Sequence, residues 1–344
     1  MIARIKQRLP GAPPLRGRML DRVIIWSGVL LVASVVAFGT YYYVDQSGQS
    51  GAPSKEQIMR AQLNMFEQAV REDPNNITNR LALGDAYLSV DRYDDAASQY
   101  EAALVINDES TLGHIGLGRA LFELGDFDKA TENFEAILAQ YEEEDISGAI
   151  VEAAHYYLGS IALEQEKPDE AIKQLTEATK LERADADAWF LLGTAYRQKG
   201  DLDKAIEALE QSTLFVPDFT EAFELLAQVY DDKGDAAGAL YARGMVSYAK
   251  GDMREAARQL QAAVDTSPTL APAFAGLGLI LENIGEKEGA TSAYEQAVHL
   301  DPDNFNARSG LARLSGQTGE SSDSGLPADH PVATDSATEE GATP

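Results

Sequence analysis

The group of side chains that most resembles a catalytic or metal site consists of four carboxylates close together in the chain: Glu221, Glu224, Asp231 and Asp232. Carboxylate oxygens are ligands that Ca²⁺ prefers, so one hypothesis is a calcium site supporting an enzyme or an enzyme subunit. The chain has 56 acidic and 28 basic residues, however, so closely spaced carboxylates are expected from composition alone. A helical face exposed to water explains the same residues, and we prefer that interpretation.

No other group of side chains combines a nucleophile with a base or has metal-ligand spacing. The chain contains no cysteine, which excludes disulfides, thiol nucleophiles and cysteine metal sites, and no two of its four histidines are at ligand spacing. Gly276-Leu277-Gly278 has Leu281 where a dinucleotide-binding loop needs glycine, and the sequence has no phosphate-loop motif. We therefore predict no catalytic residue, no cofactor and no metal ion.

The charge balance argues against a nucleic-acid partner. The formal net charge is −28, and a phosphate backbone repels such a surface. Apolar residues make up 44% of the 344 residues, which is enough for a packed core. The charge is uneven, because residues 1–22 carry six basic side chains and one acid, Asp21.

An uncharged run at residues 23–44 follows this basic segment. As a helix it would be about 33 Å long, close to the ~30 Å hydrocarbon core of a bilayer. Trp26 lies near one end and three tyrosines, residues 41–43, near the other, where amphipathic rings settle at the lipid boundary. We predict a single-pass helix in the lipid bilayer of the cell membrane, with the N-terminus cytoplasmic and the following chain extracytoplasmic.

Two other interpretations of this run stay open. A buried core helix is the weaker one, because an uncharged stretch of this length at an N-terminus rarely has that explanation. A cleavable signal peptide is the other, since Ala37-Phe38-Gly39 offers small residues at the two positions that a signal peptidase needs. The apolar stretch continues past Gly39 to Val44, which favours an uncleaved anchor.

Two polar segments flank the middle of the chain. Residues 45–54 are small and polar, and we predict a flexible tether. Residues 316–344 contain six acids, no Lys or Arg, and many Gly, Ser, Thr and Pro residues. Since such a segment cannot bury apolar surface, we predict a disordered acidic tail.

The middle of the chain is a repeat built around small residues, which we call anchors, at steps of 34, 41, 34, 34, 17 and 34 residues. The anchors are Gly84, Gly118, Gly159, Gly193, Ala227, Gly244 and Gly278. Alanine lies twelve residues after each anchor, and most units have a bulky residue sixteen after it: Tyr100, Phe134, Leu175, Leu209, Leu260 and Tyr294. Apolar residues at spacings of three and four predict two amphipathic helices in each unit.

A Gly-Asp or Gly-Glu pair separates the two helices of most units. The pairs are Gly125-Asp126, Gly200-Asp201, Gly234-Asp235, Gly251-Asp252 and Gly285-Glu286. Glycine accepts the left-handed conformation that ends a first helix, and aspartate can cap the second. Each helix pair leaves an apolar face that only a neighbouring pair can cover, so the units must stack.

The 34-residue period and this pattern resemble tetratricopeptide repeats over residues 55–315. The resemblance implies an all-α fold, an α-solenoid in which antiparallel helix pairs form a superhelix, here preceded by one transmembrane helix. It also implies a concave surface, lined by the first helix of each pair, that holds peptide segments of other proteins.

The expected order contains two irregularities. We expect a half unit at 55–76, units at 77–110, 111–144, 152–185 and 186–219, a half-step at 220–236, units at 237–270 and 271–304, and a closing helix at 304–315. Seven extra residues near 142–148 predict a longer helix end and loop. At the half-step, either one helix is missing or residues 238–250 serve both helix roles. His114 and His155 fall at equivalent positions, where we expect packing rather than catalysis.

The resemblance assigns specific residues to the concave surface. The peptide-contact candidates are Leu81, Leu88, Leu112, Ile115, Arg119, Phe122, Tyr156, Leu163, Phe190 and Arg197. Further positions are Asp85, Ser160, Thr194, Gln228 and the four carboxylates of the fifth unit and, beyond the half-step, Tyr241, Met245 and Tyr248. Alternatively, any one of these residues only packs against the adjacent helix.

These residues predict a basic or apolar protein or peptide partner. Repeats of this family that bind the C-terminal carboxylate of a chaperone use Lys, Asn and Arg on this surface, whereas only Arg119 and Arg197 are basic here. An acidic surface repels an acidic tail, which argues against chaperone-tail binding. The expected function is a membrane-anchored scaffold in protein assembly, secretion support or envelope organisation. The alternative is a secreted, soluble binding protein released by cleavage near Gly39.

Overall fold

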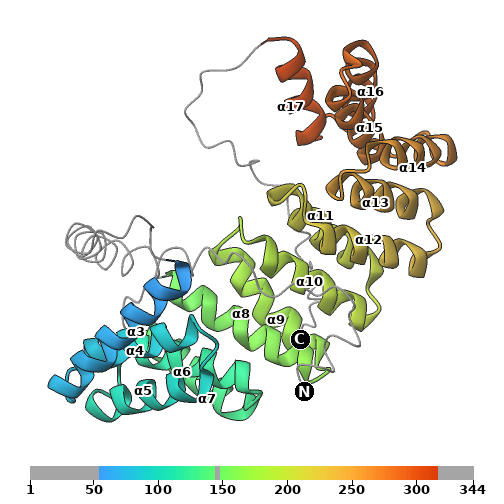
Figure 1. The fold of residues 1–344 in the computed structure, drawn as a ribbon. Helices are drawn as coiled ribbons and strands as arrows, with labels where there is room; N and C mark the ends of the chain where they lie inside the picture. The colour runs from blue at the N-terminus through green and yellow to red at the C-terminus, as the bar shows by residue number, and fades with distance from the viewer. Residues whose placement is uncertain (1–53, 144–147, 317–344) are drawn as a thin grey trace, which may run out of the picture. The chain divides into compact units, whose positions relative to one another are not determined.

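A computed structural model of the chain describes residues 54–143 and 148–316, and every regular element in them is an α-helix (Figure 1). The all-α helical repeat expected from the sequence is therefore confirmed. The predicted basic segment 1–22, the membrane span 23–44, nearly all of the tether and the tail lie outside the described residues. None of the helices in the described ranges is both long and apolar enough to cross a membrane.

The described helices fall into two compact parts that meet in sequence after Gly234. The N-terminal part contains α3 (Lys55–Glu72), α4 (Ile77–Leu88), α5 (Tyr93–Ile106), α6 (Thr111–Leu124), α7 (Phe127–Glu143), α8 (Gly148–Glu164), α9 (Pro168–Leu181), α10 (Ala186–Lys199), α11 (Leu202–Phe215) and α12 (Thr220–Lys233). The C-terminal part contains α13 (Ala236–Ala249), α14 (Met253–Thr266), α15 (Ala271–Asn283), α16 (Lys287–Leu300) and α17 (Phe305–Leu314).

Anchors and bulky residues hold the two helices of each repeat together. A Cβ atom added at Gly84 would lie 2.7 Å from the Tyr100 ring, and one at Gly159 would lie 2.5 Å from the Leu175 side chain. These contacts leave no room for a larger anchor, so the backbone of the first helix approaches the second closely. The alanines twelve residues after the anchors are buried as well, as Ala96 shows.

Left-handed residues and aspartate caps form the turns inside most repeats. The glycines of the predicted Gly-Asp and Gly-Glu turns all have a positive φ, for example 79° at Gly125. Where a repeat lacks this glycine, Asp91 or Glu166 takes the same conformation, with φ of 59° and 57°. The carboxylate of Asp252 accepts a hydrogen bond from the Glu255 amide at 3.1 Å, which caps α14.

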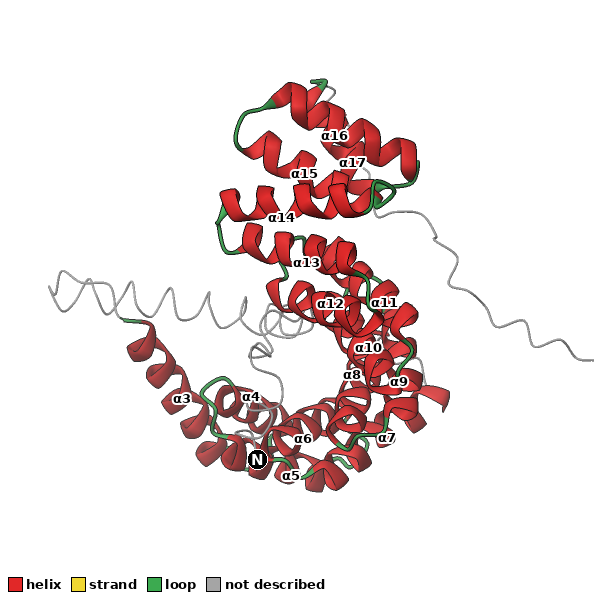
Figure 2. Cartoon of the chain, turned by 90° about the vertical axis from the view of Figure 1, so that its right-hand side faces the viewer, coloured by secondary structure: helices red, strands yellow, loops and turns green. Residues whose placement is uncertain are grey.

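First helices approach one another on one side of the repeat. In the N-terminal part the first helices are α4, α6, α8, α10 and α12, and each contacts the next, whereas successive second helices in the described residues make no comparable contacts. Figure 2 shows α4, α6, α8 and α10 on the inner side of the curved run of this part, with α5, α7 and α9 on its outer side. The inner side is therefore built from first-helix side chains.

The two irregularities change helix lengths and helix roles. The seven extra residues fall where α7 ends and α8 begins, and both helices have 17 residues where α9 has 14. At the half-step, α13 packs extensively against α14 and also contacts α15. Within the C-terminal part, α13 therefore acts as the first helix of a pair, and α12 is the last helix of the N-terminal part.

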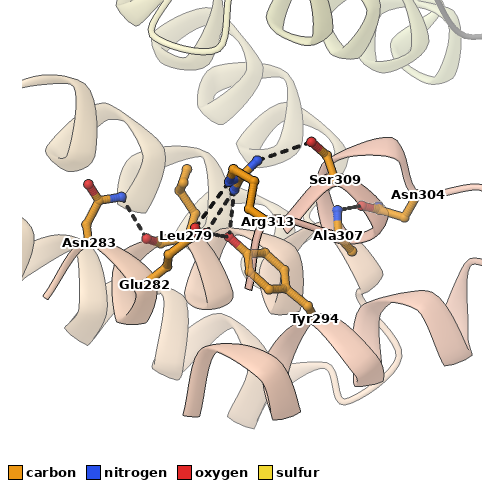
Figure 3. Close-up of polar contacts among 8 residues, drawn as sticks. All are labelled: Leu279, Glu282, Asn283, Tyr294, Asn304, Ala307, Ser309 and Arg313. Atoms are coloured by element: carbon orange, nitrogen blue, oxygen red, sulfur yellow. Dashed lines mark hydrogen bonds and ion pairs between the residues drawn. The ribbon is translucent and has the colours of Figure 1, made fainter. Parts of the chain in front are cut away.

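A polar network fixes the closing helix α17 to the last full repeat (Figure 3). The guanidinium of Arg313 donates to both carboxylate oxygens of Glu282, at 3.1 and 2.8 Å, and the Tyr294 hydroxyl donates to Glu282 at 2.8 Å. The hydrogen bond from Arg313 lowers the pKa of Glu282, and burial is the main cause that raises the pKa of Tyr294. The three side chains come from α15, α16 and α17, so the network joins three helices.

Replacing Glu282 with Gln is expected to weaken this attachment at neutral pH by no more than about 1 kcal/mol, because the Arg313 side chain is half-exposed. Since pairing lowers the folded-state pKa, the carboxylate stabilises the fold above its unfolded pKa and loses this effect as the pH falls through the folded-state value. Thermal unfolding of the wild type and of Glu282→Gln should therefore differ at neutral pH and converge as the pH falls below the lowered folded-state pKa of Glu282.

Glu295→Gln is the matched control for this measurement, because Glu295 is an exposed carboxylate on α16 outside the network. We expect this variant to unfold like the wild type at both pH values. A stability difference between Glu282→Gln and the wild type that is the same at acid and neutral pH would contradict an ionic contribution from Glu282.

Candidate protein-binding surface

The inner side of the N-terminal part presents four residues of each first helix around its anchor. One of them lies three residues before the anchor, and the others lie one, four and five residues after it. Spacings of three and four put these residues on one side of a helix. We call this set the first-helix face. Its members are Leu81, Asp85, Leu88, Ser89, Ile115, Arg119, Phe122, Glu123, Tyr156, Ser160, Leu163, Glu164, Phe190, Thr194, Arg197, Gln198, Glu224, Gln228, Asp231 and Asp232.

The ten peptide-contact candidates differ in how much of their surface water can reach. Leu81, Leu88, Arg119, Phe122, Phe190 and Arg197 are half-buried, and Leu112, one turn before Ile115 on α6, is 47% exposed. Ile115, Tyr156 and Leu163 are only 3%, 2% and 8% exposed. These three belong to the hydrophobic clusters between the helices, so they support the face but offer little surface to a partner.

A tyrosine hydroxyl reaches the first-helix face at its N-terminal end. The ring of Tyr100 lies against Gly84 and Gly116, and its hydroxyl donates to the Asp85 carboxylate at 2.5 Å. Desolvation by the surrounding protein raises the pKa of Asp85, while the Tyr100 hydrogen bond and the charge of Arg119 act in the opposite direction. A carboxylate at this position is therefore held between a hydroxyl donor and a cation.

Arg197 joins the last two first helices of the N-terminal part. Its Nε atom donates to Asp232 at 2.9 Å, and a second guanidinium nitrogen donates to the Gln228 side chain at 2.8 Å. The two acceptors lie one and five residues after the anchor of α12, whereas Arg197 lies four after the anchor of α10. The basic candidates Arg119 and Arg197 thus both face acids on neighbouring first helices.

Glu164 is a member of the face that the sequence analysis missed. It lies five residues after the anchor of α8, at the position that Asp232 has in α12. Desolvation raises its pKa, although the residue is exposed to water. The sequence signal that could have found Glu164 is this equivalence with Asp232, because the candidates taken from α8 stopped at Leu163.

The two equivalent histidines make structural hydrogen bonds. The ring nitrogens of His114 lie 2.9 Å from the Asn133 side chain and 2.8 Å from the carbonyl of Asp108, and a ring nitrogen of His155 lies 2.7 Å from Gln174. At the same repeat position, Trp189 donates to the carbonyl six residues before it. This position therefore ties a first helix to its second helix or to the preceding loop.

The proposed calcium ligands do not form a metal site in the structure. Within residues 54–143 and 148–316, no group of three or more His, Asp or Glu side chains is arranged to hold a metal ion. Asp232 instead accepts a hydrogen bond from Arg197. These carboxylates leave the α12 end of the face acidic.

Comparison with protein families matches models of the tetratricopeptide repeat along most of the described chain. One such model matches residues 60–111, 156–214 and 217–271, a second matches 108–184, and a third matches 271–304. The comparison with curated proteins found no match.

Several solved structures are similar to this chain at low identity. YrrB, described as a tetratricopeptide repeat protein with an unusual peptide-binding site, is 22% identical over 61% of this chain and 96% of its own, with a TM-score of 0.40. MamA from Desulfovibrio magneticus is 21% identical over 52% and 95%, with a TM-score of 0.45. A repeat protein from Parabacteroides merdae is 15% identical over 82% and 98%, with a TM-score of 0.43.

Proposed function

Because the chain belongs to the tetratricopeptide repeat family, we propose that it is a scaffold that binds segments of other proteins through the first-helix face of its N-terminal part. The observation that carries this proposal is the set of half-buried apolar side chains on that face, Leu81, Leu88, Phe122 and Phe190. Apolar and aromatic side chains of this kind anchor partner residues in protein interfaces. We propose no catalytic role.

The charges of the face support a basic or apolar partner. Its two arginines, Arg119 and Arg197, face acids of neighbouring first helices and do not form a separate positive patch. Carboxylates outnumber them, with Glu164 near the middle of the face and Glu224 and Asp231 at its α12 end. Such a surface attracts a positively charged segment and repels an acidic tail or a nucleic acid.

The proposed setting is the outer side of a cell membrane. Residues 23–44 would anchor the chain in the lipid bilayer, with residues 1–22 in the cytoplasm and the repeats outside. This arrangement suits a role in protein assembly, secretion support or envelope organisation. The alternative is a secreted, soluble binding protein produced by cleavage near Gly39.

Mass spectrometry of the mature N-terminus distinguishes the anchored form from the secreted one. An intact N-terminus in the membrane fraction supports the anchor, and a chain beginning near residue 40 in the soluble fraction supports the secreted form. Protease should digest the repeats when it is added to cells whose outer layer is permeable but whose cytoplasmic membrane is intact. Digestion only after the inner side is opened would contradict an extracytoplasmic location for both forms.

Photocrosslinking from Phe122 tests the binding surface itself. A benzophenone amino acid at this half-buried position should capture other proteins in membranes, because the side chain lies on the first-helix face. The matched control is the same probe at Tyr141, an aromatic residue on the second helix α7 that is 44% exposed. Equal capture from both positions, or capture of only lipid and further copies of this chain from Phe122, would contradict the assignment of the surface.

A further inference from the structure

We propose that Glu164, together with Ser160, forms a seat for an arginine side chain of the bound segment. This inference rests on the proposed function, since it names the partner chemistry that the first-helix face would select. It follows from comparing equivalent positions in repeats of the same chain, because repeats with the same backbone geometry place equivalent side chains at equivalent points.

The seat is occupied in one repeat by a residue of the chain itself. On α12, Gln228 and Asp232, one and five residues after the anchor, together hold the guanidinium of Arg197 at 2.8 and 2.9 Å. Arg197 lies four residues after the anchor of the preceding first helix. The pair of side chains at these two positions is therefore able to bind a guanidinium group from the inner side.

The same contact recurs in the C-terminal part with the charges exchanged. Glu282 lies four residues after the anchor Gly278, and Arg313 lies one residue after Ala312, which follows Gly278 by one 34-residue period. Their atoms approach to 2.8 Å. In both parts of the chain, the side chain four residues after one anchor therefore contacts the side chain one residue after the next anchor.

For the equivalent seat on α8, the position that corresponds to Arg197 holds an apolar residue. Ser160 and Glu164 lie one and five residues after the anchor Gly159, and the residue four after the preceding anchor is Phe122 in place of an arginine. Ser160 is only 8% exposed and its hydroxyl donates to the Tyr156 carbonyl at 2.8 Å, so Ser160 would line the base of the seat and Glu164 would supply the accessible acceptor. Glu164 is exposed, so its carboxylate is accessible to a cation supplied by a ligand.

The neighbours of the seat favour arginine as the occupant. The Phe122 ring packs edge-on against Tyr157, with centroids 5.3 Å apart, and remains half-buried on the face. A planar guanidinium can stack on such a ring while it donates to a carboxylate, which an ammonium group does less well. The apolar candidates on α4 and α6 would contact hydrophobic residues next to that arginine.

Peptides selected from a random dodecapeptide display library on the purified full-length chain provide the test. We expect the selected peptides to contain an arginine beside hydrophobic residues. Replacing that arginine by citrulline, which has the same shape without the charge, should weaken binding about fivefold, the effect of one partly exposed ion pair. Glu164→Gln should bind both peptides with nearly equal affinity.

Two variants make the readout specific to the seat. Phe122→Arg places a guanidinium beside α8 at the position that Arg197 has beside α12. This internal arginine should occupy the seat, so the ratio of arginine-peptide to citrulline-peptide affinity should fall toward one. Glu135→Gln removes an exposed carboxylate from the second helix α7 and should leave the ratio unchanged. Circular dichroism of each variant verifies that the helices remain folded.

The outcomes separate this inference from the proposed function. Failure to select any peptide on the wild-type chain would overturn the proposed function and this inference together. Selected peptides that lack arginine would overturn the inference alone, because they would show a binding surface without a basic seat. An affinity ratio that Glu164→Gln leaves unchanged would overturn it equally.

Discussion

Replacing Gly116 with Leu is expected to destabilise α5 and α6 by about 3 kcal/mol, at the upper end of the usual cost of overpacking a core. A Cβ atom at Gly116 would lie 2.3 Å from the Tyr100 ring, which has no free space to move into because it also lies against Gly84. Amide hydrogen exchange of α5 and α6 is the suitable measurement, since repeat proteins unfold in parts.

The double variant Gly116→Leu with Tyr100→Leu should recover most of this loss. Other repeats already use leucine at both positions, as in Leu175 with Leu191 and Leu209 with Leu225. The two substitutions therefore exchange one size-matched pair for another that the same backbone accommodates, and their effects should be far from additive. Additive losses in the double variant would show that the pairing of sizes is not the cause.

Gly148→Leu is the control for the glycine substitution. Gly148 is the first residue of α8, and a Cβ atom there would meet nothing within 4 Å. We expect hydrogen exchange in α5 and α6 to be unchanged in this variant, because the added side chain extends into open space.

Replacing Phe134 with Ala is expected to cost about 3–5 kcal/mol, the usual range for removing a buried phenylalanine. Phe134 is 0% exposed, stacks on the Tyr157 ring at a centroid distance of 4.9 Å and contacts the anchor Gly118. Its removal leaves a cavity between α6, α7 and α8 that these helices can fill only partly. Urea unfolding followed by the helical circular dichroism signal should shift to lower denaturant concentration.

Tyr141→Ala tests whether that loss depends on burial. Tyr141 lies on the same helix α7 but is 44% exposed, so its truncation removes an aromatic ring without creating a comparable cavity. We expect its unfolding curve to stay close to that of the wild type. Similar losses in both variants would contradict a core role for Phe134.

The fold could be predicted from the sequence because a given position of the repeat has a similar packing role in successive units. A small anchor such as Gly118 and a bulky residue such as Phe134 are two halves of the same packing interaction, so their spacing reveals both helices. The role of α13 could not be predicted in this way. Residues 220–234 and 238–250 both have a first-helix pattern, and the pairing of α13 with α14 depends on tertiary packing.

The candidate surface was less predictable than the fold. The position three before the anchor holds Leu81, Ile115, Tyr156 and Phe190, but only the first and last keep accessible surface. Coverage depends on the size of side chains on the adjoining helices, which a single repeat pattern does not specify. Glu164 was missed because its significance depends on what stands across from it on α6.

The pairing of Tyr100 with Gly116 has a consequence for how such an array can evolve. Tyr100 belongs to one sequence repeat, whereas Gly116, one of the two glycines that its ring lies against, belongs to the next, and Tyr294 with Gly310 follows the same arrangement. Duplication or deletion of a segment cut at the repeat boundary would bring mismatched side chains together. Recombination is tolerated best when the exchanged block runs from a second helix through the first helix that follows it.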